Sequence, residues 1–413
     1  MYLTEEERGI RDGLWGRGAA HALEMQIETG KFFGAQRFVP VRNVHMMGTL
    51  ESMGDAGYAY FERLVREGTH ARVSLTSNPR CTDPLTAAAL QQDERLVARE
   101  SDLFDLQARL GALTVNTCIN YQNVYQPHFG EHVAWGDTGT VAFANSALGA
   151  RTNYESGPAA LAAALTGRTP AYGFHLNEQR IATVHVRVRA RMRDIADWGA
   201  LGAAVGRGIL DYWTVPVLEF EPSAEPGPDD LKHLAASAAA HGSLAMFHIV
   251  GVTPEAPTLE AALGGRPPVR TLEIGEAEIS AVYDLYPPTD DPVQLVVFTA
   301  PQLSLFELQR LVDLLRGRQV NPRTRMIVTT SDLNRGEATR LGSVAELERA
   351  GALVVVGTCW YIMYPEKMTD AFGWTRVVTN SAKLANNIGG ARYKSVLLRT
   401  EDCIEAAVRG AFR

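Results

Sequence analysis

Residues 293–330 read VQLVVFTAPQLSLFELQRLVDLLRGRQVNPRTRMIVTT, and this stretch decides the fold. Two segments, Val293 to Thr299 and Arg325 to Thr329, have the length and the β-branched content of buried strands. Between them, residues 303–315 repeat apolar side chains at the spacing of one helix face. A strand, a helix and a second strand in this order predict two parallel strands joined by a crossover helix.

The same alternation continues toward the C-terminus and predicts a doubly wound α/β domain over residues 286–413. Two further α/β regions are expected at 1–120 and 121–285. The second contains a Gly- and Asn-rich block, residues 126–175, whose apolar content is too high for a disordered linker. We interpret this block as the ordered wall of a site. The remaining expected elements are helices at 344–350, 381–385 and 401–411, and strands at 353–356, 376–378 and 395–398.

Two of the four cysteines follow apolar β-type runs, and each is preceded by a threonine. Cys118 comes after residues 113–115, and Cys359 comes after residues 353–356. Open α/β sheets place their chemistry beyond the carboxyl ends of the strands, so we expect both thiols at one shared site. Two interpretations stay open, a disulfide or half of a metal or iron–sulfur site.

The overall composition excludes several classes of protein. A formal charge of -7 and a pI near 5.9, without a basic stripe, argue against a nucleic-acid partner. The first eleven residues lack the apolar core of a signal peptide. No apolar stretch reaches the roughly 20 residues that span a bilayer, so no membrane partner is expected. We therefore expect a cytoplasmic protein, in which reduced thiols disfavour the disulfide.

One polar group lies where a strand leads into a helix. Thr379, Asn380 and Ser381 precede a helix that contains Lys383. Free backbone N–H groups, hydroxyls and an ammonium at such a place can bind an anionic substrate. The alternative is ordinary capping of the helix, for which serine and asparagine are common.

A second polar concentration lies between residues 145 and 155. Arg151 could clamp a carboxylate or phosphate, or it could pair locally with Glu155 in a solvated loop. Asp137 and Glu155 are candidate acid/base carboxylates, with His45 as a third candidate, although each could be a structural hydrogen-bonding group. The other candidate substrate contacts are Asn78, Asn145, Ser146, Thr152 and Asn153.

Seven motifs lie in order across nearly the whole chain: MYLTEEE at residues 1–7, HMMG at 45–48, GEHVAW at 130–135, ANSALGARTN at 144–153, ALAAALTGRTP at 160–170, FHIVGVTPE at 247–255 and TNSAK at 379–383. Together they resemble the large, catalytic subunit of aconitase X. The resemblance implies an aconitase-like fold, with several α/β/α domains and mainly parallel sheets around a central cleft. It also implies hydro-lyase chemistry on a small hydroxylated carboxylate or phosphate.

The resemblance also implies an iron–sulfur cluster held by three cysteines, of which two match Cys118 and Cys359. The third matches Ala300, and a neighbouring histidine of the family matches Gln302. Because alanine cannot bind iron, the resemblance implies a divergent member with an altered or absent cluster, a single divalent metal or no cofactor. The resemblance also implies either a separate small swivelling subunit as partner or a homologue that works without one.

Three functional hypotheses stay open. The favoured one is a lyase, either a dehydratase or a related isomerase, that keeps the family's pocket without a normal cluster. In it, Asp137, Glu155, His45 and Lys383 would carry the chemistry. The alternatives are a cluster-bearing dehydratase of cis-3-hydroxyproline or mevalonate 5-phosphate, and a catalytically inactive binding homologue.

Overall fold

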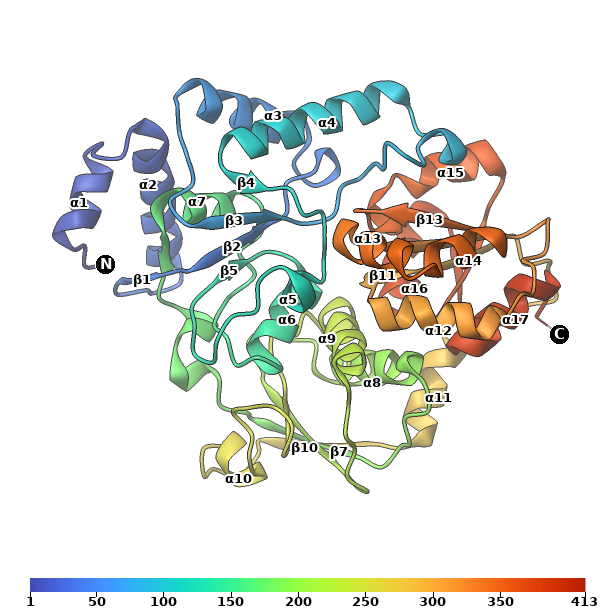
Figure 1. The fold of residues 1–413 in the computed structure, drawn as a ribbon. Coiled ribbons are helices and arrows are strands. Elements are labelled where there is room, and N and C mark those ends of the chain that lie inside the picture. The colour runs from blue at the N-terminus through green and yellow to red at the C-terminus, as the bar shows by residue number, and fades with distance from the viewer. Residues whose placement is uncertain (413) are drawn as a thin grey trace.

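Three α/β units follow one another along the chain in the computed structural model, which describes residues 1–412 (Figure 1). Each unit is built on its own parallel sheet of four or five strands. A separate antiparallel pair joins β1 (Phe38–Pro40) to β6 (Arg168–Pro170). These sheets confirm the predicted α/β class with mainly parallel strands.

The first sheet has the strand order β4-β3-β2-β5, and all of its strand pairs are parallel. Helix α7 is almost entirely buried because alanine and leucine cover it on every side. Strand β5 belongs to this sheet although it lies beyond residue 120. The expected division of the chain into regions at residues 120 and 285 stays a prediction. The elements are β2 (Asn43–Met46), β3 (Ser74–Ser77), β4 (Ala112–Leu113), β5 (Ala134–Trp135), α1 (Glu5–Arg11), α2 (Arg17–Phe32), α3 (Leu50–Arg66), α4 (Glu94–Arg109), α5 (Asn120–Asn123), α6 (Thr138–Ser146) and α7 (Pro158–Thr166).

The second sheet has the order β10-β7-β8-β9 and is also parallel throughout. Helices α8 and α9 pack with their backbones in close approach, which glycine permits. A Cβ atom on Gly202 would lie 2.4 Å from the Leu234 carbonyl oxygen. The elements are β7 (Val184–Val188), β8 (Pro216–Phe220), β9 (His248–Ile249), β10 (Arg270–Ile274), α8 (Ile195–Ile209), α9 (Pro228–Gly242), α10 (Leu259–Ala262) and α11 (Glu276–Asp284).

The third sheet, with the order β13-β12-β11-β14-β15, is the doubly wound sheet that residues 293–330 predict. All nine residues of its central strand β11 are buried. Val296 and Phe298 face one apolar cluster, and Leu295 and Val297 face another, as expected for a strand covered on both sides. The elements are β11 (Leu295–Leu303), β12 (Arg325–Thr330), β13 (Ala352–Val356), β14 (Arg376–Thr379), β15 (Lys394–Leu397), α12 (Leu305–Leu315), α13 (Asp332–Arg340), α14 (Ser343–Arg349), α15 (Pro365–Phe372), α16 (Ala382–Asn387) and α17 (Thr400–Arg409).

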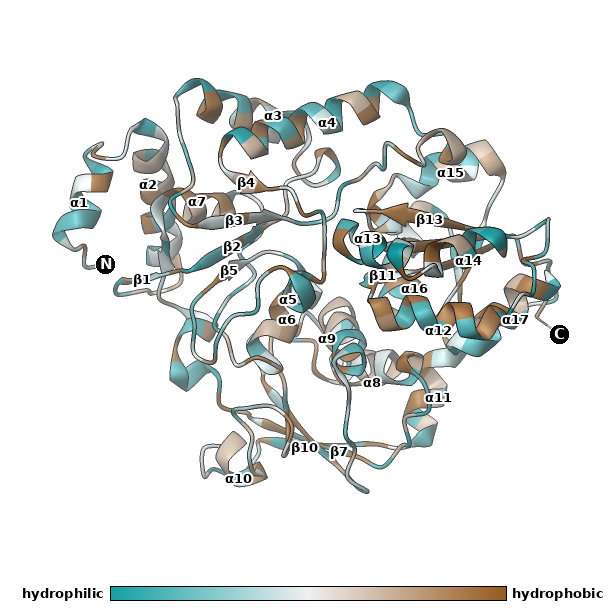
Figure 2. Ribbon diagram, viewed as in Figure 1, coloured by the Kyte–Doolittle hydropathy of each residue, from teal (hydrophilic) through white to brown (hydrophobic). Residues whose placement is uncertain are grey.

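The hydropathy of the ribbon agrees with this layering. In Figure 2, strand β13 is brown, whereas α3, α4 and α12 alternate between brown and teal. A strand buried between helix layers is apolar throughout, and a helix that covers a sheet is apolar on one side only.

All three sheets share one topology. In each, the first three strands along the chain run outward in one direction, and the fourth pairs with the first on its other side. The order in which strands are added to the sheet thus reverses beside the first strand. These switch points are the strand pairs β2/β5, β7/β10 and β11/β14. Crevices at the carboxyl ends of such strand pairs are the usual place of binding sites in α/β proteins.

Candidate active site

The carboxyl ends of the first and third sheets meet, and the candidate site lies at this junction. The loop after β3 pairs with the loop after β13, since the Arg80 backbone N–H donates to the Gly357 carbonyl at 2.8 Å. His45 lies at the end of β2, and Asp137 follows β5 by two residues. The site is therefore built where two switch points face each other.

Cys118 and Cys359 are both buried and lie in hydrogen-bond contact at this junction. The Gln302 backbone N–H donates to Cys118 Sγ at 3.3 Å, and Thr299 Oγ1 lies 3.5 Å from Cys359 Sγ. The hydrogen bond to Cys359, together with burial, raises the pKa of the Cys118 thiol. Burial opposes ionisation of Cys359, but the bond from Cys118 and the charge of Lys383 outweigh it and lower its pKa.

Lys383 brings a positive charge to the two thiols from helix α16. Its side chain is 3% exposed, and Nζ donates to Thr138 Oγ1 at 3.1 Å. Burial opposes the charge of this lysine, but the attraction of Asp137, Tyr361 and the two cysteines is stronger and raises its pKa. Lys383 is therefore charged at neutral pH.

Asp137 lies beside this ammonium and also begins helix α6. Its Oδ2 atom accepts hydrogen bonds from the backbone N–H groups of Gly139 at 3.1 Å and Thr140 at 3.4 Å, as an N-cap does. Its Oδ1 atom lies 3.7 Å from Lys383 Nζ. One oxygen is thus used for structure, while the other faces the buried cation.

His45 is fully buried and connects β2 to the loop after β3. Its Nδ1 atom lies 2.8 Å from Thr76 Oγ1, and its Nε2 atom lies 3.2 Å from Asn78 Oδ1. Burial lowers the pKa of His45 to about 4, against the opposing effect of Asp137. The imidazole is therefore neutral at physiological pH.

Glu155 lies in a second polar group, next to histidines that the sequence analysis did not select. Thr169 Oγ1 donates to Glu155 Oε1 at 2.8 Å, and His175 Nε2 lies 3.7 Å from the same oxygen. His175 Nδ1 in turn lies 2.9 Å from His132 Nδ1. Burial and the neighbouring His175 lower the pKa of His132 to about 4.

The polar residues between 145 and 153 are used mainly to hold loops in place. Arg151 donates to the His175 carbonyl at 3.1 Å and to Asn177, not to Glu155. Local pairing with Glu155 is therefore wrong. The Asn145 amide donates to the Thr152 and Ala245 carbonyls. Ser146 Oγ accepts from the Phe247 N–H, Thr152 Oγ1 donates to the Asn153 carbonyl, and Asn153 bonds the backbone of Tyr172 and Phe174. Their role as substrate contacts stays a prediction.

The group before α16 caps the helix, which is one of the two roles that the sequence left open. Ser381 is the N-cap of α16, since its Oγ accepts from the Leu384 N–H at 3.1 Å. The same hydroxyl donates to the Ala300 carbonyl at 2.5 Å. Thr379 Oγ1 accepts from the Ser381 N–H, and the Asn380 amide donates to Thr400. Capping therefore accounts for Ser381, while Lys383 reaches the thiols.

Sequence reasoning missed several residues at the junction, since none belongs to a recognisable pattern. Thr138 bonds Lys383, and the Tyr361 ring centroid lies 5.8 Å from Lys383 Nζ. Asn120, two residues after Cys118, is fully buried, and neither polar atom of its side chain has a partner within residues 1–412. A buried amide without partners is satisfied by water or a bound molecule. Its position next to a Thr-Cys pair was the available signal.

The donor set does not fit the iron–sulfur cluster that the resemblance implies. Such a cluster needs a thiolate or comparable ligand at each protein-held iron. Ala300 carries no ligand atom, and the amide of Gln302 is engaged in hydrogen bonds. Within residues 1–412, no three His, Cys, Asp or Glu side chains are grouped to hold a metal ion. We derive no chemical step through a cluster.

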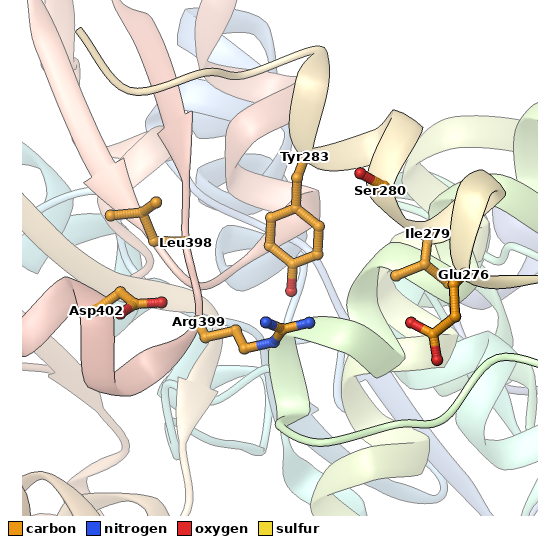
Figure 3. A pocket seen from close by; sticks show the side chains of 7 residues that line it. All are labelled: Glu276, Ile279, Ser280, Tyr283, Leu398, Arg399 and Asp402. Atoms are coloured by element: carbon orange, nitrogen blue, oxygen red, sulfur yellow. The ribbon is translucent and has the colours of Figure 1, made fainter.

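A cavity of about 430 Å³ lies apart from this site, between α11 and the β15–α17 connection (Figure 3). Arg399 and Tyr283 in its lining already have a partner in Asp197. Arg399 Nε donates to Asp197 Oδ1 at 3.0 Å, and the Tyr283 hydroxyl donates to the same oxygen at 2.8 Å. This cavity lines the contact between the second and third units and lacks the thiols and the buried lysine of the candidate site.

Comparisons with known proteins agree with the site and the fold. Family models named aconitase X first, second and third domain match residues 1–178, 182–284 and 293–409. The phosphomevalonate dehydratase large subunit of Thermococcus kodakarensis is 33% identical over 93% of this chain and 94% of its own. That of Methanothermobacter thermautotrophicus is 34% identical, over 94% of each chain. The cis-3-hydroxy-L-proline dehydratase of Pseudomonas aeruginosa is 32% identical over 99% of this chain and 70% of its own.

A crystal structure of aconitase X from Thermococcus kodakaraensis, in its holo-form, matches with a TM-score of 0.88 and 30% identity. The match covers 98% of this chain and 100% of the other. The fold, the site and these dehydratase relatives define a lyase. More narrowly, the chain belongs to the aconitase X family. Among residues 1–412, no helix has the length and apolar content needed to cross a membrane.

Proposed function

We propose that this chain is the catalytic subunit of a dehydratase that removes water from a small hydroxylated anion. The names of its relatives support this, since phosphomevalonate and cis-3-hydroxy-L-proline are both hydroxylated carboxylates. The observation that carries the proposal is the convergence of Lys383, Asp137, the two thiols and the His45–Asn78 pair at the junction of two sheets.

The anionic end of the substrate is assigned to Lys383 and Asn78. Lys383 supplies a buried positive charge, whose attraction for an anion is much stronger than it would be in water. Asn78 lies beside the neutral His45, and its side-chain amide is assigned to a carboxylate or phosphate oxygen of the substrate. The buried, unpartnered amide of Asn120 is a further contact for the polar substrate.

Removal of a proton next to the carboxylate is assigned to Asp137. Its Oδ2 atom is fixed by two backbone N–H groups, which hold the carboxylate in place. Its Oδ1 atom faces Lys383 and is assigned to accept this proton, while the departing hydroxide takes a proton from the Lys383 ammonium and leaves as water. Glu155, backed by His175, is the second candidate, because it follows the strand segment next to β5.

A small partner subunit belongs to this proposal. Relatives that match nearly end to end are named large subunits, whereas the hydroxyproline dehydratases extend beyond the region they share with this chain. We infer that a small swivelling subunit covers the junction during catalysis. The four free, buried cysteines suit a cytoplasmic enzyme, where thiols stay reduced.

The test is a substrate screen on anaerobically purified protein, alone and with an added small subunit from an aconitase X relative. Hydroxyproline isomers, mevalonate 5-phosphate and simple hydroxy acids are incubated with the protein, and mass spectrometry follows the loss of one water. Water loss from one of these substrates is expected. Binding without any water loss would instead favour a noncatalytic homologue.

A further inference from the structure

The segment from Thr299 to Gln302 contacts both cysteines at the junction. Thr299 Oγ1 lies 3.5 Å from Cys359 Sγ, and the Gln302 N–H donates to Cys118 Sγ at 3.3 Å. Ala300 lies between these two contacts in the chain and is fully buried. The residue that matches the family's third cysteine therefore lies in the segment that contacts both thiols, but its side chain is a methyl group.

Gln302 is fully buried, and its side-chain amide joins the two cysteine segments to each other. Nε2 donates to the Asn116 carbonyl at 3.1 Å and to the Thr358 carbonyl at 3.0 Å. Oε1 accepts from the Cys118 backbone N–H at 3.2 Å. The Gln302 side chain thus uses both of its N–H donors and its oxygen acceptor to connect the backbone of the Cys118 segment to that of the Cys359 segment.

The backbone of Gln302 extends this connection to the second unit. Its carbonyl oxygen accepts from Lys232 Nζ of helix α9 at 3.3 Å. Lys232 is fully buried and also bonds Asp229 and Glu307. Gln302 consequently contacts segments from all three units, and an iron–sulfur cube between the thiols would have to break its bonds to the cysteine segments.

We propose that Gln302 is a positioning residue that replaces a cluster: its amide ties the Cys118 segment to the Cys359 segment, and the protein takes up no iron–sulfur cluster. The two sulfur atoms then contact each other and the protein instead of iron. This inference concerns how the site is assembled and holds whichever substrate the enzyme uses.

The first test measures iron and sulfide in the wild-type protein. The protein is purified anaerobically, incubated with ferrous iron, sulfide and a thiol reductant, and then desalted. Only trace iron and sulfide are expected to remain bound. Stoichiometric iron and sulfide, with a visible charge-transfer absorption, would overturn the proposal. A wild-type measurement does not depend on the folding of any variant or on any activity.

The second test measures how fast each cysteine is alkylated in the native protein, by mass spectrometry of its peptides. Gln302→Ala should speed modification of Cys118 and Cys359 at least about tenfold relative to Cys403. Cys403 is buried in helix α17 and reports global unfolding. Gln302→Glu serves as a second variant, because it keeps the shape but loses the two N–H donors.

Gln107→Ala is the matched control, since Gln107 is also fully buried and donates to the Gly48 carbonyl at 2.6 Å, away from the cysteines. It should leave the rates of Cys118 and Cys359 relative to Cys403 unchanged. If Gln302→Ala and Gln302→Glu also leave these relative rates unchanged, the positioning role of Gln302 is wrong.

Discussion

Lys383 and Asp137 form a buried pair of opposite charges, and the proposed chemistry depends on both. Replacing Lys383 with methionine keeps the length of the side chain but removes the charge. We expect kcat/KM to fall at least about 100-fold, as when a preorganised charged group is lost from an active site. Asp137 would also lose its partner, at a cost of about 3 kcal/mol in unfolding free energy.

Lys367→Met is the matched control for this change. Lys367 is exposed and lies 5.0 Å from the centroid of the Tyr364 ring, so the variant also removes a lysine from a tyrosine ring. Its kcat/KM should stay within about twofold of wild type, because a cation–π contact at an exposed site contributes little free energy. An equal loss of activity in both variants would contradict the role of Lys383.

His45 makes the stability of the protein depend on pH. Its pKa falls from 6.5 to about 4 on folding, so the unfolded chain binds more protons between these values. The stability that the protein gains from keeping His45 neutral is fully present above pH 6.5 and is lost as the pH falls toward 4. A shift of this size corresponds to about 3 kcal/mol.

Urea unfolding at a series of pH values checks this prediction. The unfolding free energy of wild type should decrease between pH 6.5 and 4, and His45→Gln should show a smaller decrease. His21→Gln, at an exposed position of helix α2, should keep the wild-type slope. If His45→Gln also keeps the wild-type slope, the assignment to His45 is wrong.

At the scale of elements, the contact between α8 and α9 depends on glycine. A Cβ atom at Gly202 would lie 2.4 Å from the Leu234 carbonyl oxygen, and backbone atoms cannot rotate out of the way. Gly202→Ala should therefore destabilise the protein by about 3 kcal/mol or more. Gly336→Ala, in helix α13 with nothing within 4 Å of the new methyl, should be neutral or stabilising by up to about 1 kcal/mol. Thermal unfolding of both variants measures the difference.

Most elements of the third unit could be predicted, because β-branched runs and amphipathic helices alternate there. Helices α13 and α15 were missed, since α13 is strongly polar and α15 is short and follows Pro365 directly. Strand β11 runs on to Leu303, past an irregular register that apolar periodicity does not reveal.

The candidate site was only partly predictable, for a physical reason. A Thr-Cys pair after a strand indicates where a thiol lies along the sheet, so Cys118 and Cys359 were accessible to sequence reasoning. The partners of each polar side chain depend on loops brought together by folding. Arg151 bonds the His175 loop and Gln302 bonds both cysteine segments, and no local spacing indicates either contact.

At the scale of the whole molecule, a buried ion pair joins the second and third units. Glu307 of α12 bonds Lys232 and His233 of α9, the latter at 2.7 Å. Burial opposes the charge of Glu307, but these two partners lower its pKa to about 2. Glu307→Gln should cost about 3 kcal/mol because it leaves Lys232 buried with less opposite charge.

The exposed pair of Glu346 and Arg349 provides the control for this variant. Glu346→Gln should change the unfolding free energy by no more than about 0.5 kcal/mol. Chemical denaturation with two probes, one reporting each unit, would also show whether the units separate in Glu307→Gln. Equal stability of the two variants would mean that the ion pair does not hold the units together.

The repeated topology of the three sheets is also a property of the whole molecule. No sequence period reveals it, because the units share strand order but not residue spacing. It places a switch point in every unit, and the junction of the first and third units combines two of them. The thiols, Lys383 and Asp137 converge there from segments more than 200 residues apart.

The dehydration rate of Asp137→Asn, compared with wild type, tests the central claim most directly. Asparagine still caps helix α6 but cannot take up a proton. Both proteins are assayed with an added small subunit, using mevalonate 5-phosphate and cis-3-hydroxy-L-proline. We predict that wild type removes water from one of these substrates and that Asp137→Asn is at least about 100-fold slower while equally folded. Equal rates in the two proteins, or no water loss by wild type from either substrate, would contradict a dehydratase built on this junction.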